Sequence, residues 1–444
     1  MDILPNELIL LIGKYIEGDI FTKLALSKCS RRLQWLFDPP MVYSSLHISS
    51  VGARDFRLIQ NLLNRPDLAR LVQHAYFLFT WSFRPDTRYM TEPWNPRWDS
   101  MIEPIVDDIC ESEIEKVRWR RELRECCDEA WLGVLLTRLD YLKSITFACG
   151  DERGLMNSIL KKAALRQRPF STTAPFPCCR RSPSKFTLCN GLVYLPAVRT
   201  IEAIETFEYL SDEMDLISSN FPDLKNYTCP ITEIVVSPAY NCRGIRDWVA
   251  TCTKLERLKI DIGMVLDIPS SYVFDPIDFR RCLDPCKETL KALSIGFDNS
   301  YGRFSATYRT LEVRHHLGRD DLPFGSFKEL IVLEHLSMRH ANLMRLRGVN
   351  IRDSYDAAPQ CLVDLLPTSL KSLEITDVVQ AFILGLISEL RLLVRQHTTI
   401  IPQFKRIVLH LQERQLELAM FLIDDLKSEC ERLGVRLMII GRSI

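Results

Sequence analysis

Two adjacent histidines, His315 and His316, are followed closely by Asp320 and Asp321 and are the side chains best suited to metal chemistry. Imidazole and carboxylate groups are common metal ligands. Their spacing matches no established metal motif, however, and a polar loop explains it equally well. Fifteen cysteines are scattered along the chain without a Cys-x-x-Cys pair, so they do not predict a structural zinc site. We therefore expect neither a metal nor any other cofactor.

A covalent or acid–base active site would need a nucleophile with a positioned base. The sequence contains no Gly-x-Ser-x-Gly turn, no phosphate-binding glycine loop and no His-Glu-x-x-His motif. No residue is predicted to be catalytic, and we expect a protein that works by binding. An enzyme with an unrecognised site is the minor alternative.

Charge and composition narrow the class of partner. Lys plus Arg equals Asp plus Glu, with 57 of each, so the net charge is zero. Nucleic-acid-binding proteins normally carry a basic excess, and we expect no nucleic-acid partner. The most apolar stretch, residues 378–394, is interrupted by Glu389 and Arg391, which predicts a buried helix and no membrane contact. The start of the chain lacks the pattern of a secretory signal, so we expect a cytoplasmic or nuclear location, with most cysteines reduced.

The first forty residues predict a small helical unit. Pro5 suits the first turn of a helix, because its missing N–H would be unpaired there. Leu8, Ile12 and Ile16 recur at four-residue spacing and form an apolar stripe along this helix. Asp19 is a good N-cap for a second helix, since its carboxylate can accept a backbone N–H. About forty residues are too few to bury a core, so the unit needs a partner or a neighbouring domain.

The order of residues in this unit resembles the F-box, a helical motif that docks a protein onto the small adaptor of cullin–RING ubiquitin ligases. The resemblance covers residues 1–40 and rests on Leu4-Pro5-x-Glu7, an apolar helix, Asp19-Ile20, and the sequence LALSKCSRR at 24–32. It implies that a three-helix F-box binds a Skp-type adaptor and, through it, a cullin scaffold. It places the following residues in the core or on the adaptor-facing surface: Leu4, Pro5, Leu8, Ile9, Ile12, Leu24, Leu26 and Cys29. Periodicity alone leaves open a simple helical cap on a larger fold.

A degenerate repeat occupies much of the remaining chain. Its core is a large apolar residue, two others, a second apolar residue, one other, and a third apolar residue. Clear copies begin at Leu255, Leu290, Leu333, Leu370 and Phe404, and weaker copies begin at Leu142, Val198 and Ile231. The alternation within each copy predicts a short half-buried strand, and apolar periodicity between copies predicts helices.

Repetition of a strand and a helix at about 20 to 45 residues is typical of a solenoid. The pattern resembles the irregular leucine-rich repeats that follow many fungal F-boxes. We therefore predict an α+β or α/β solenoid with parallel strands over residues 136–444, ending in a C-terminal cap at 413–444. An ordinary α/β domain whose parallel strands look alike is the alternative.

Two segments interrupt this pattern. Residues 41–135 are interpreted as a linker and the N-terminal region of the repeat domain, with an aromatic insert from Tyr76 to Trp98. Residues 161–186 contain Lys and Arg, four prolines and no acidic residue, which predicts a long basic loop of unknown role. Residues 99–115 are acidic, and the two charged segments could attract each other.

The same alternation predicts an exposed strand face that can bind a protein. The candidate target-binding residues on this face are Arg257, Lys259, His335, Ser337, Glu374, Arg406 and His410, and Val408 is expected to point the same way. Together with the F-box resemblance, this predicts a non-catalytic substrate-recognition subunit of an SCF-type E3 ubiquitin ligase, whose repeats bind an unidentified target protein. A leucine-rich-repeat interaction scaffold with no ligase role is the alternative.

Overall fold

The computed structural model describes residues 4–16, 19–48, 53–78, 97–125, 127–148, 155–172, 175–185, 195, 197–204, 229–239, 246, 249–263, 274–297, 322–344, 346 and 361–442. The chain divides into two compact units. Unit 1 comprises residues 1–204 and 223–230, and unit 2 comprises residues 205–222 and 231–444. Each unit combines helices with strands that pair in parallel, which confirms the predicted mixed α/β class.

Unit 1 begins with four short helices. They are α1 (Asn6–Tyr15), α2 (Ile20–Ser27), α3 (Arg31–Leu36) and α4 (Pro39–Tyr43). Asp19 caps α2 as predicted, because its carboxylate accepts the Thr22 N–H at 3.0 Å. Ser30 and Asp38 cap α3 and α4 in the same way. These side chains satisfy backbone donors that the first turn of each helix leaves unpaired.

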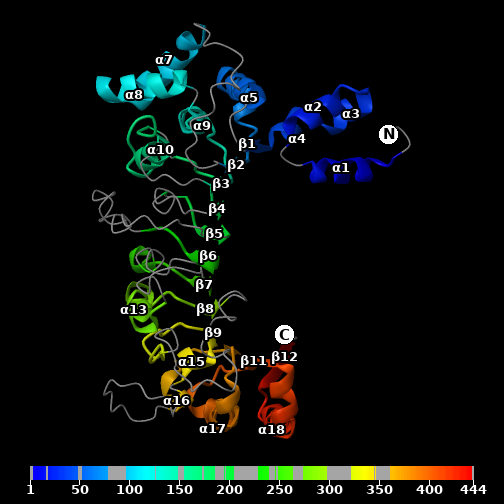
Figure 1. Cartoon of the computed structure of the whole chain (residues 1–444), viewed down its shortest axis with the longest axis vertical. Helices are drawn as coiled ribbons and strands as arrows, with labels where there is room; N and C mark the ends of the chain where they lie inside the picture. Colours follow the sequence, from blue (N-terminus) through cyan, green and yellow to red (C-terminus); the bar gives the residue numbers. More distant parts are fainter. Residues whose placement is uncertain are drawn as a thin grey trace. The chain divides into compact units, whose positions relative to one another are not determined.

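The rest of unit 1 is built on parallel strands that neighbour one another in chain order (Figure 1). The strands are β1 (Ser45–Ile48), β2 (His74–Leu78), β3 (Ser144–Ala148), β4 (Arg181–Lys185) and β5 (Thr200–Ile204). The helices between them are α5 (Ala53–Asn64), α6 (Pro66–Ala69), α7 (Arg97–Ile109), α8 (Glu113–Arg124), α9 (Asp128–Leu136) and α10 (Leu155–Ala164). Most of the predicted aromatic insert lies outside the described residues.

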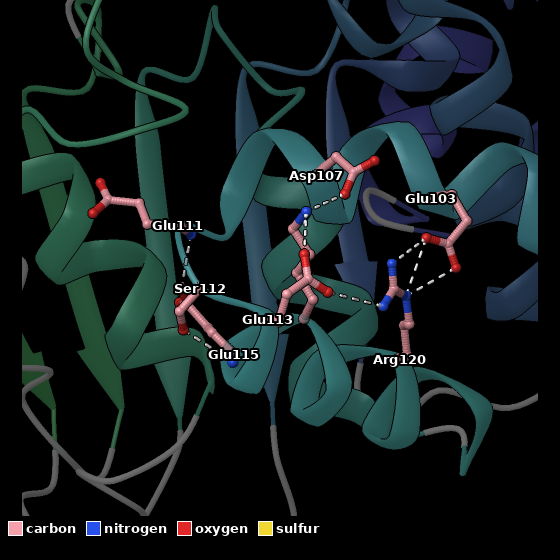
Figure 2. A network of polar contacts seen from close by, with 8 residues as sticks. Glu103, Asp107, Glu111, Ser112, Glu113, Glu115 and Arg120 are labelled. Carbon is pink, nitrogen blue, oxygen red and sulfur yellow. Dashed lines mark hydrogen bonds and ion pairs between the residues drawn. The ribbon is translucent and has the colours of Figure 1, made fainter.

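Charged side chains join α7 to α8 (Figure 2). The Arg120 guanidinium donates to both carboxylate oxygens of Glu103, at 2.7 to 3.1 Å. The Lys116 ammonium lies 2.7 Å from the carboxylate of Asp107 and 3.0 Å from that of Glu113. The acidic residues of 99–115 are therefore matched largely by basic residues of the next helix. Such exposed pairs contribute little free energy individually, but together they fix how α7 and α8 meet.

The predicted basic loop of residues 161–186 is wrong as a continuous loop. Helix α10 continues to Ala164, and β4 forms at Arg181–Lys185. Pro183 lies within β4, where it cannot donate a hydrogen bond, and β4 pairs with β3 at Arg181 and Ser184, on either side of it. Lys162 is buried, and its ammonium lies 2.6 Å from the Glu115 carboxylate. The predicted attraction between the acidic and basic segments is thus confirmed for this pair.

Unit 2 repeats the same architecture, with each strand pairing in parallel with the next. The strands are β6 (Glu233–Ala239), β7 (Arg257–Ile262), β8 (Ala292–Phe297), β9 (His335–Arg339), β10 (Ser372–Thr376), β11 (Arg406–Gln412) and β12 (Arg436–Arg442). The helices and 3₁₀ turns are α13 (Pro276–Arg281), η5 (Asp284–Cys286), α15 (His340–Leu343), α16 (Leu362–Leu365), η7 (Gln380–Phe382), α17 (Ile383–Ile400) and α18 (Glu413–Arg432). No helix among the described residues has the length and apolarity needed to cross a membrane.

The strands of unit 2 follow from the repeated apolar motif. The second apolar residue of each clear copy is in register with the next, and all five are buried. These residues are Leu258, Leu293, Leu336, Leu373 and Ile407. All eight copies of the motif, in both units, coincide with strands β3 and β5–β11. Side-chain alternation along a strand therefore puts the intervening residues on the opposite face.

The C-terminal segment, predicted as a cap, consists of a helix followed by a strand. Gly434, at a φ of 76°, separates α18 from β12. On α18, Met420 is exposed and the neighbouring Ala419 is buried. Val408 was predicted to face outward but is buried. Its register partners are Glu374 on β10 and Met438 on β12, so it is flanked by larger side chains on both sides.

Candidate functional site

The outer side of α1 is apolar and exposed. Leu8, Leu11, Ile12 and Tyr15 are 46%, 47%, 37% and 86% exposed, respectively. Spacings of three and four residues place their side chains on one side of the helix. We call these four residues the α1 surface. An exposed group of large apolar side chains marks a site of interaction, because leaving it in water is unfavourable.

The inner side of α1 holds the helix in place. Ile9 and Gly13 are buried there. A Cβ atom at position 13 would come within 2.9 Å of Met41 Cε and 3.0 Å of Phe37 Cε1. Glycine therefore allows a close approach of α1 to Phe37 at the end of α3 and to Met41 of α4. Only part of the apolar stripe of α1 is buried in this contact. The part that stays exposed is the α1 surface.

A hydrogen-bonded arginine fixes the beginning of α1. The Arg32 guanidinium donates to the Asn6 side-chain oxygen at 2.6 and 2.8 Å and also to the Leu4 carbonyl. Arg32 lies on α3, so this contact joins α3 to the beginning of α1. Sequence reasoning missed this role, because the partners are 26 and 28 residues away along the chain.

The residues implied by the F-box resemblance fall into four groups. Ile9 belongs to the core, and Leu8 and Ile12 belong to the α1 surface. The remaining residues, Leu4, Leu24 and Leu26, are half-buried, whereas Pro5 and Cys29 are exposed. Leu11 and Tyr15, which helical spacing places beside Leu8 and Ile12 in the predicted apolar stripe, were not among the residues that the resemblance implied.

Unit 2 carries a polar hollow of ≈ 570 Å³ on the exposed face of its strands. Five of the seven predicted strand-face residues line it: Lys259, His335, Ser337, Glu374 and His410. The other two, Arg257 and Arg406, are exposed and lie in the same register row as His335. The seven predicted residues therefore lie on one continuous surface of the strands, which we call the strand face.

Small side chains on β8 create this hollow. Ala292, Ser294 and Gly296 alternate along the exposed side of β8 and line its floor. A Cβ atom at position 296 would approach Asp261 Oδ1 to 2.8 Å. The Asp261 carboxylate of β7 thus leans across its register partner Gly296. Its nearest ion-pair partner among the described residues is the Lys259 ammonium, at 3.8 Å.

An imidazole–carboxylate contact forms another wall of the hollow. His410 Nε2 lies 2.6 Å from the Glu374 carboxylate, across the neighbouring strands β10 and β11. The other ring nitrogen, Nδ1, is buried and has no hydrogen-bond partner among the described residues. Hydroxyl groups of Ser294, Ser337 and Ser372 line the space between these walls. The hollow therefore offers both charge signs and several hydroxyl groups for recognition of a polar ligand.

Three strand-face residues resemble a nucleophile with its base, but their geometry differs from that of an activated serine. Ser372 Oγ lies 3.4 Å from His335 Nδ1, and His335 Nε2 lies 4.0 Å from the Glu334 carboxylate. A working nucleophile–base contact is about 2.6 to 3.2 Å. The Glu334 carboxylate instead binds the Lys371 ammonium at 2.8 Å, and this contact holds the pKa of Glu334 below its usual value. We therefore treat the strand face as a binding surface.

No group of three or more metal-binding side chains occurs among the described residues. The His315, His316, Asp320 and Asp321 cluster lies outside that part of the chain. A scan against models of known protein families and a search of curated proteins both gave no match for this sequence.

Proposed function

We propose that the chain is the substrate-recognition subunit of an SCF-type E3 ubiquitin ligase. In this proposal the N-terminal helices are an F-box that binds a Skp-type adaptor on a cullin scaffold. The strand–helix repeats form a leucine-rich-repeat solenoid that holds a target protein. The chain contributes by positioning the target, and other subunits perform ubiquitin transfer.

The observation that carries this proposal is the α1 surface. Leu8 and Ile12 come from the residues that carry the F-box resemblance, and both are exposed beside Leu11 and Tyr15. A structural helix would bury such residues, whereas a docking helix keeps them available for a partner. The helix itself is held by Ile9, Gly13 and the Arg32 contacts. The unit therefore presents a preformed apolar surface, which lowers the entropic cost of association.

The test is binding of the full chain to purified Skp-type adaptor, measured by isothermal titration calorimetry. The Leu8→Asp/Ile12→Asp double variant should lose binding, because the interface would have to bury two carboxylates without partners. Leu384→Asp is the matched control, since Leu384 is an exposed leucine on α17 of unit 2. It should bind like the unchanged chain. Adaptor binding that survives the double variant, or a chain that binds no adaptor, contradicts the proposal.

A non-ligase scaffold is the second candidate, and the connection between α4 and β1 favours it. Helix α4 ends at Tyr43, and β1 begins at Ser45. The Ser44 carbonyl between them accepts the N–H groups of Gln73 and His74, at 2.9 and 3.0 Å. The helical unit thus continues directly into the first strand, as a cap would.

Removal of residues 1–40 separates the two candidates. Loss of a cap should lower the melting temperature of the remaining chain and expose apolar surface to a dye such as ANS. Loss of a docking module should leave the melting temperature nearly unchanged and abolish adaptor binding. A large fall in melting temperature, together with no adaptor binding by the full chain, would favour the scaffold.

A further inference from the structure

One register row of the strand face in unit 2 is unusually basic. Its successive members on β7 to β12 are Arg257, Ala292, His335, Ser372, Arg406 and Arg436. Neighbouring strands lie about 4.8 Å apart, and side chains in one register row project from the same face. Four of the six positions are therefore basic side chains in a line that crosses the strands. We call this line the basic row.

The row immediately before it shows how this sheet normally balances charge. Backbone hydrogen bonds connect Glu256, Lys291, Glu334 and Lys371 in that order. The Lys291 ammonium lies 2.9 Å from the Glu256 carboxylate, and the Lys371 ammonium lies 2.8 Å from the Glu334 carboxylate. Opposite charges thus alternate from strand to strand, which is the favourable arrangement for side chains that face each other.

The alternation ends at β11 and β12. In the row of Glu256, Lys291, Glu334 and Lys371, the next residue is Lys405, so a lysine follows a lysine. In the basic row, Arg406 is the register partner of Arg436. All three of these cations, Lys405, Arg406 and Arg436, are exposed. None of them has an ion-pair partner among the described residues. Like charges directly opposite each other destabilise a sheet, and sequences keep such unfavourable pairs mainly at functional sites.

The acidic groups of the same face are engaged elsewhere. The Glu374 carboxylate contacts His410 at 2.6 Å, and the Asp261 carboxylate lies on β7, with Lys259 as its contact. On β6 the row continues with Glu233, whose carboxylate lies 3.9 Å from the Arg257 guanidinium, at the end of the row away from β11 and β12. Positive charge therefore accumulates at β11 and β12, and the polar hollow lies beside it along the row, at Ala292, His335 and Ser372. An extended chain lying across the strands could contact both features at once.

We propose that the basic row binds an extended, acidic segment of a partner protein, with anionic side chains on Arg406 and Arg436. The inference rests on the proposed function, because it gives the chemical class of the target. Charge complementarity favours an anionic ligand. A zero net charge argues against a nucleic acid as that ligand. The adjacent hollow, lined by serine hydroxyl groups, can accept a polar side chain from a peptide.

The experiment measures binding of fluorescein-labelled peptides to the full chain by fluorescence anisotropy at low salt. The probes are an octaglutamate peptide, a serine phosphopeptide with the same number of anionic side chains, and an octaglutamine peptide as the uncharged control. We expect binding of the two anionic peptides and none of octaglutamine. Comparison of the two anionic peptides shows whether carboxylates or phosphates are preferred.

Two variants with the same net charge locate the site. Arg406→Glu/Arg436→Glu should weaken octaglutamate binding about tenfold or more. Arg281→Glu/Arg432→Glu, which changes exposed arginines elsewhere in unit 2, should change it less than about twofold. The melting temperatures of both variants verify that the chain stays folded. Equal losses in both variants, or no binding of octaglutamate by the unchanged chain, would overturn the inference.

Two further arms identify other polyanions. Single-stranded oligothymidine and vesicles containing phosphatidylserine are tested with the same variants. Tighter binding of either than of the peptides, with loss in Arg406→Glu/Arg436→Glu, would overturn the choice of a protein segment. Adaptor binding is measured in parallel. If the adaptor binds and octaglutamate does not, the inference fails while the proposed function stands. If octaglutamate binds and the adaptor does not, the basic row is a binding site on a scaffold that has no ligase role.

Discussion

Arg339 and Asp377 form an ion pair inside unit 2, with Nε of the guanidinium 3.2 Å from Oδ2 of the carboxylate. Their side chains are only 1% and 6% exposed. The guanidinium carbon also lies 4.0 Å from the centre of the Phe297 ring, a favourable cation–π distance. Phe297 and Asp377 both line the polar hollow. The buried pair therefore supports one end of the strand face.

Removal of the carboxylate from this pair should be strongly destabilising. Asp377→Asn keeps the size of the side chain and tolerates the φ of 46° at this position. It removes the Asp377 negative charge from beside a buried guanidinium, and removing one partner of a buried ion pair costs about 3–5 kcal/mol. Chemical denaturation monitored by circular dichroism measures the loss. The matched control is Asp278→Asn, which breaks an exposed pair with Arg281 and should cost at most about 1 kcal/mol. Similar losses in the two variants would show that Arg339 does not depend on Asp377.

Two glycines with similar close contacts should respond differently to alanine. At Gly133 of α9, a Cβ atom would lie 2.9 Å from Cη2 of Trp119, whose side chain is fully buried. The ring cannot move without disturbing the core, so Gly133→Ala should cost about 1–3 kcal/mol. At Gly296 the close atom is the Asp261 carboxylate oxygen, which can rotate away.

Gly296→Ala should therefore change stability by less than about 1 kcal/mol. Its effect should appear on the strand face, since the displaced carboxylate and the added methyl group alter the hollow. Thermal melts of both variants test the contrast. A larger loss for Gly296→Ala than for Gly133→Ala would mean that the Asp261 carboxylate is held rigidly.

A buried histidine should make the chain sensitive to mild acid. Burial lowers the pKa of His340 from 6.5 to about 4, and its Nδ1 accepts the Val379 N–H at 3.3 Å as a neutral ring. Between these two values the unfolded chain binds a proton that the folded chain excludes. Stability is thus constant above pH 6.5, falls as the pH drops, and loses about 3 kcal/mol by pH 4.

Denaturation at intervals between pH 7.5 and 4.5 measures this slope. Four carboxylates have lowered pKa values: Asp67, Asp107, Glu334 and Glu429. Their usual values are 3.8 for Asp and 4.5 for Glu, so they contribute mainly at the acidic end. His340→Gln should flatten the slope between pH 6.5 and 5. An unchanged slope in His340→Gln would assign the acid sensitivity to other groups.

The motif of large apolar residues predicted eight strands. Strands such as β2 and β4 were not predicted, because small residues interrupt the motif there. In register, Ala75 of β2 matches Leu46 of β1 and Ile145 of β3, so a small residue occupies the position of a large one. The backbone of β4 likewise pairs Ser182 with Ile201 of β5. The motif is interrupted at these positions, and pairing with neighbouring strands maintains the strand. Such tertiary support has no local signal in the sequence.

The binding surfaces were predictable only in part, for the same reason. Alternation correctly placed Lys259 and Glu374 on the exposed face, because that property depends on one strand at a time. The hollow depends on small residues of β8 lying between larger neighbours, such as Gly296 beside Asp261. It becomes visible only once the strands are in register. Helical spacing similarly predicted the apolar stripe of α1, but not which half of it would be buried.

Cysteine reactivity tests the burial of the core with an internal control. Cys178 is exposed, whereas its neighbour Cys179 is buried, and burial raises the pKa of Cys179 from 9.0 to about 12. The thiolate, which is the reactive form, is then about a thousandfold scarcer at pH 8. Iodoacetamide should modify Cys178 and the exposed Cys29 while Cys179 stays unmodified, as tandem mass spectrometry can show. In denaturant both neighbours should react equally. Equal reaction rates in the native chain would mean that the segment leading into β4 opens readily.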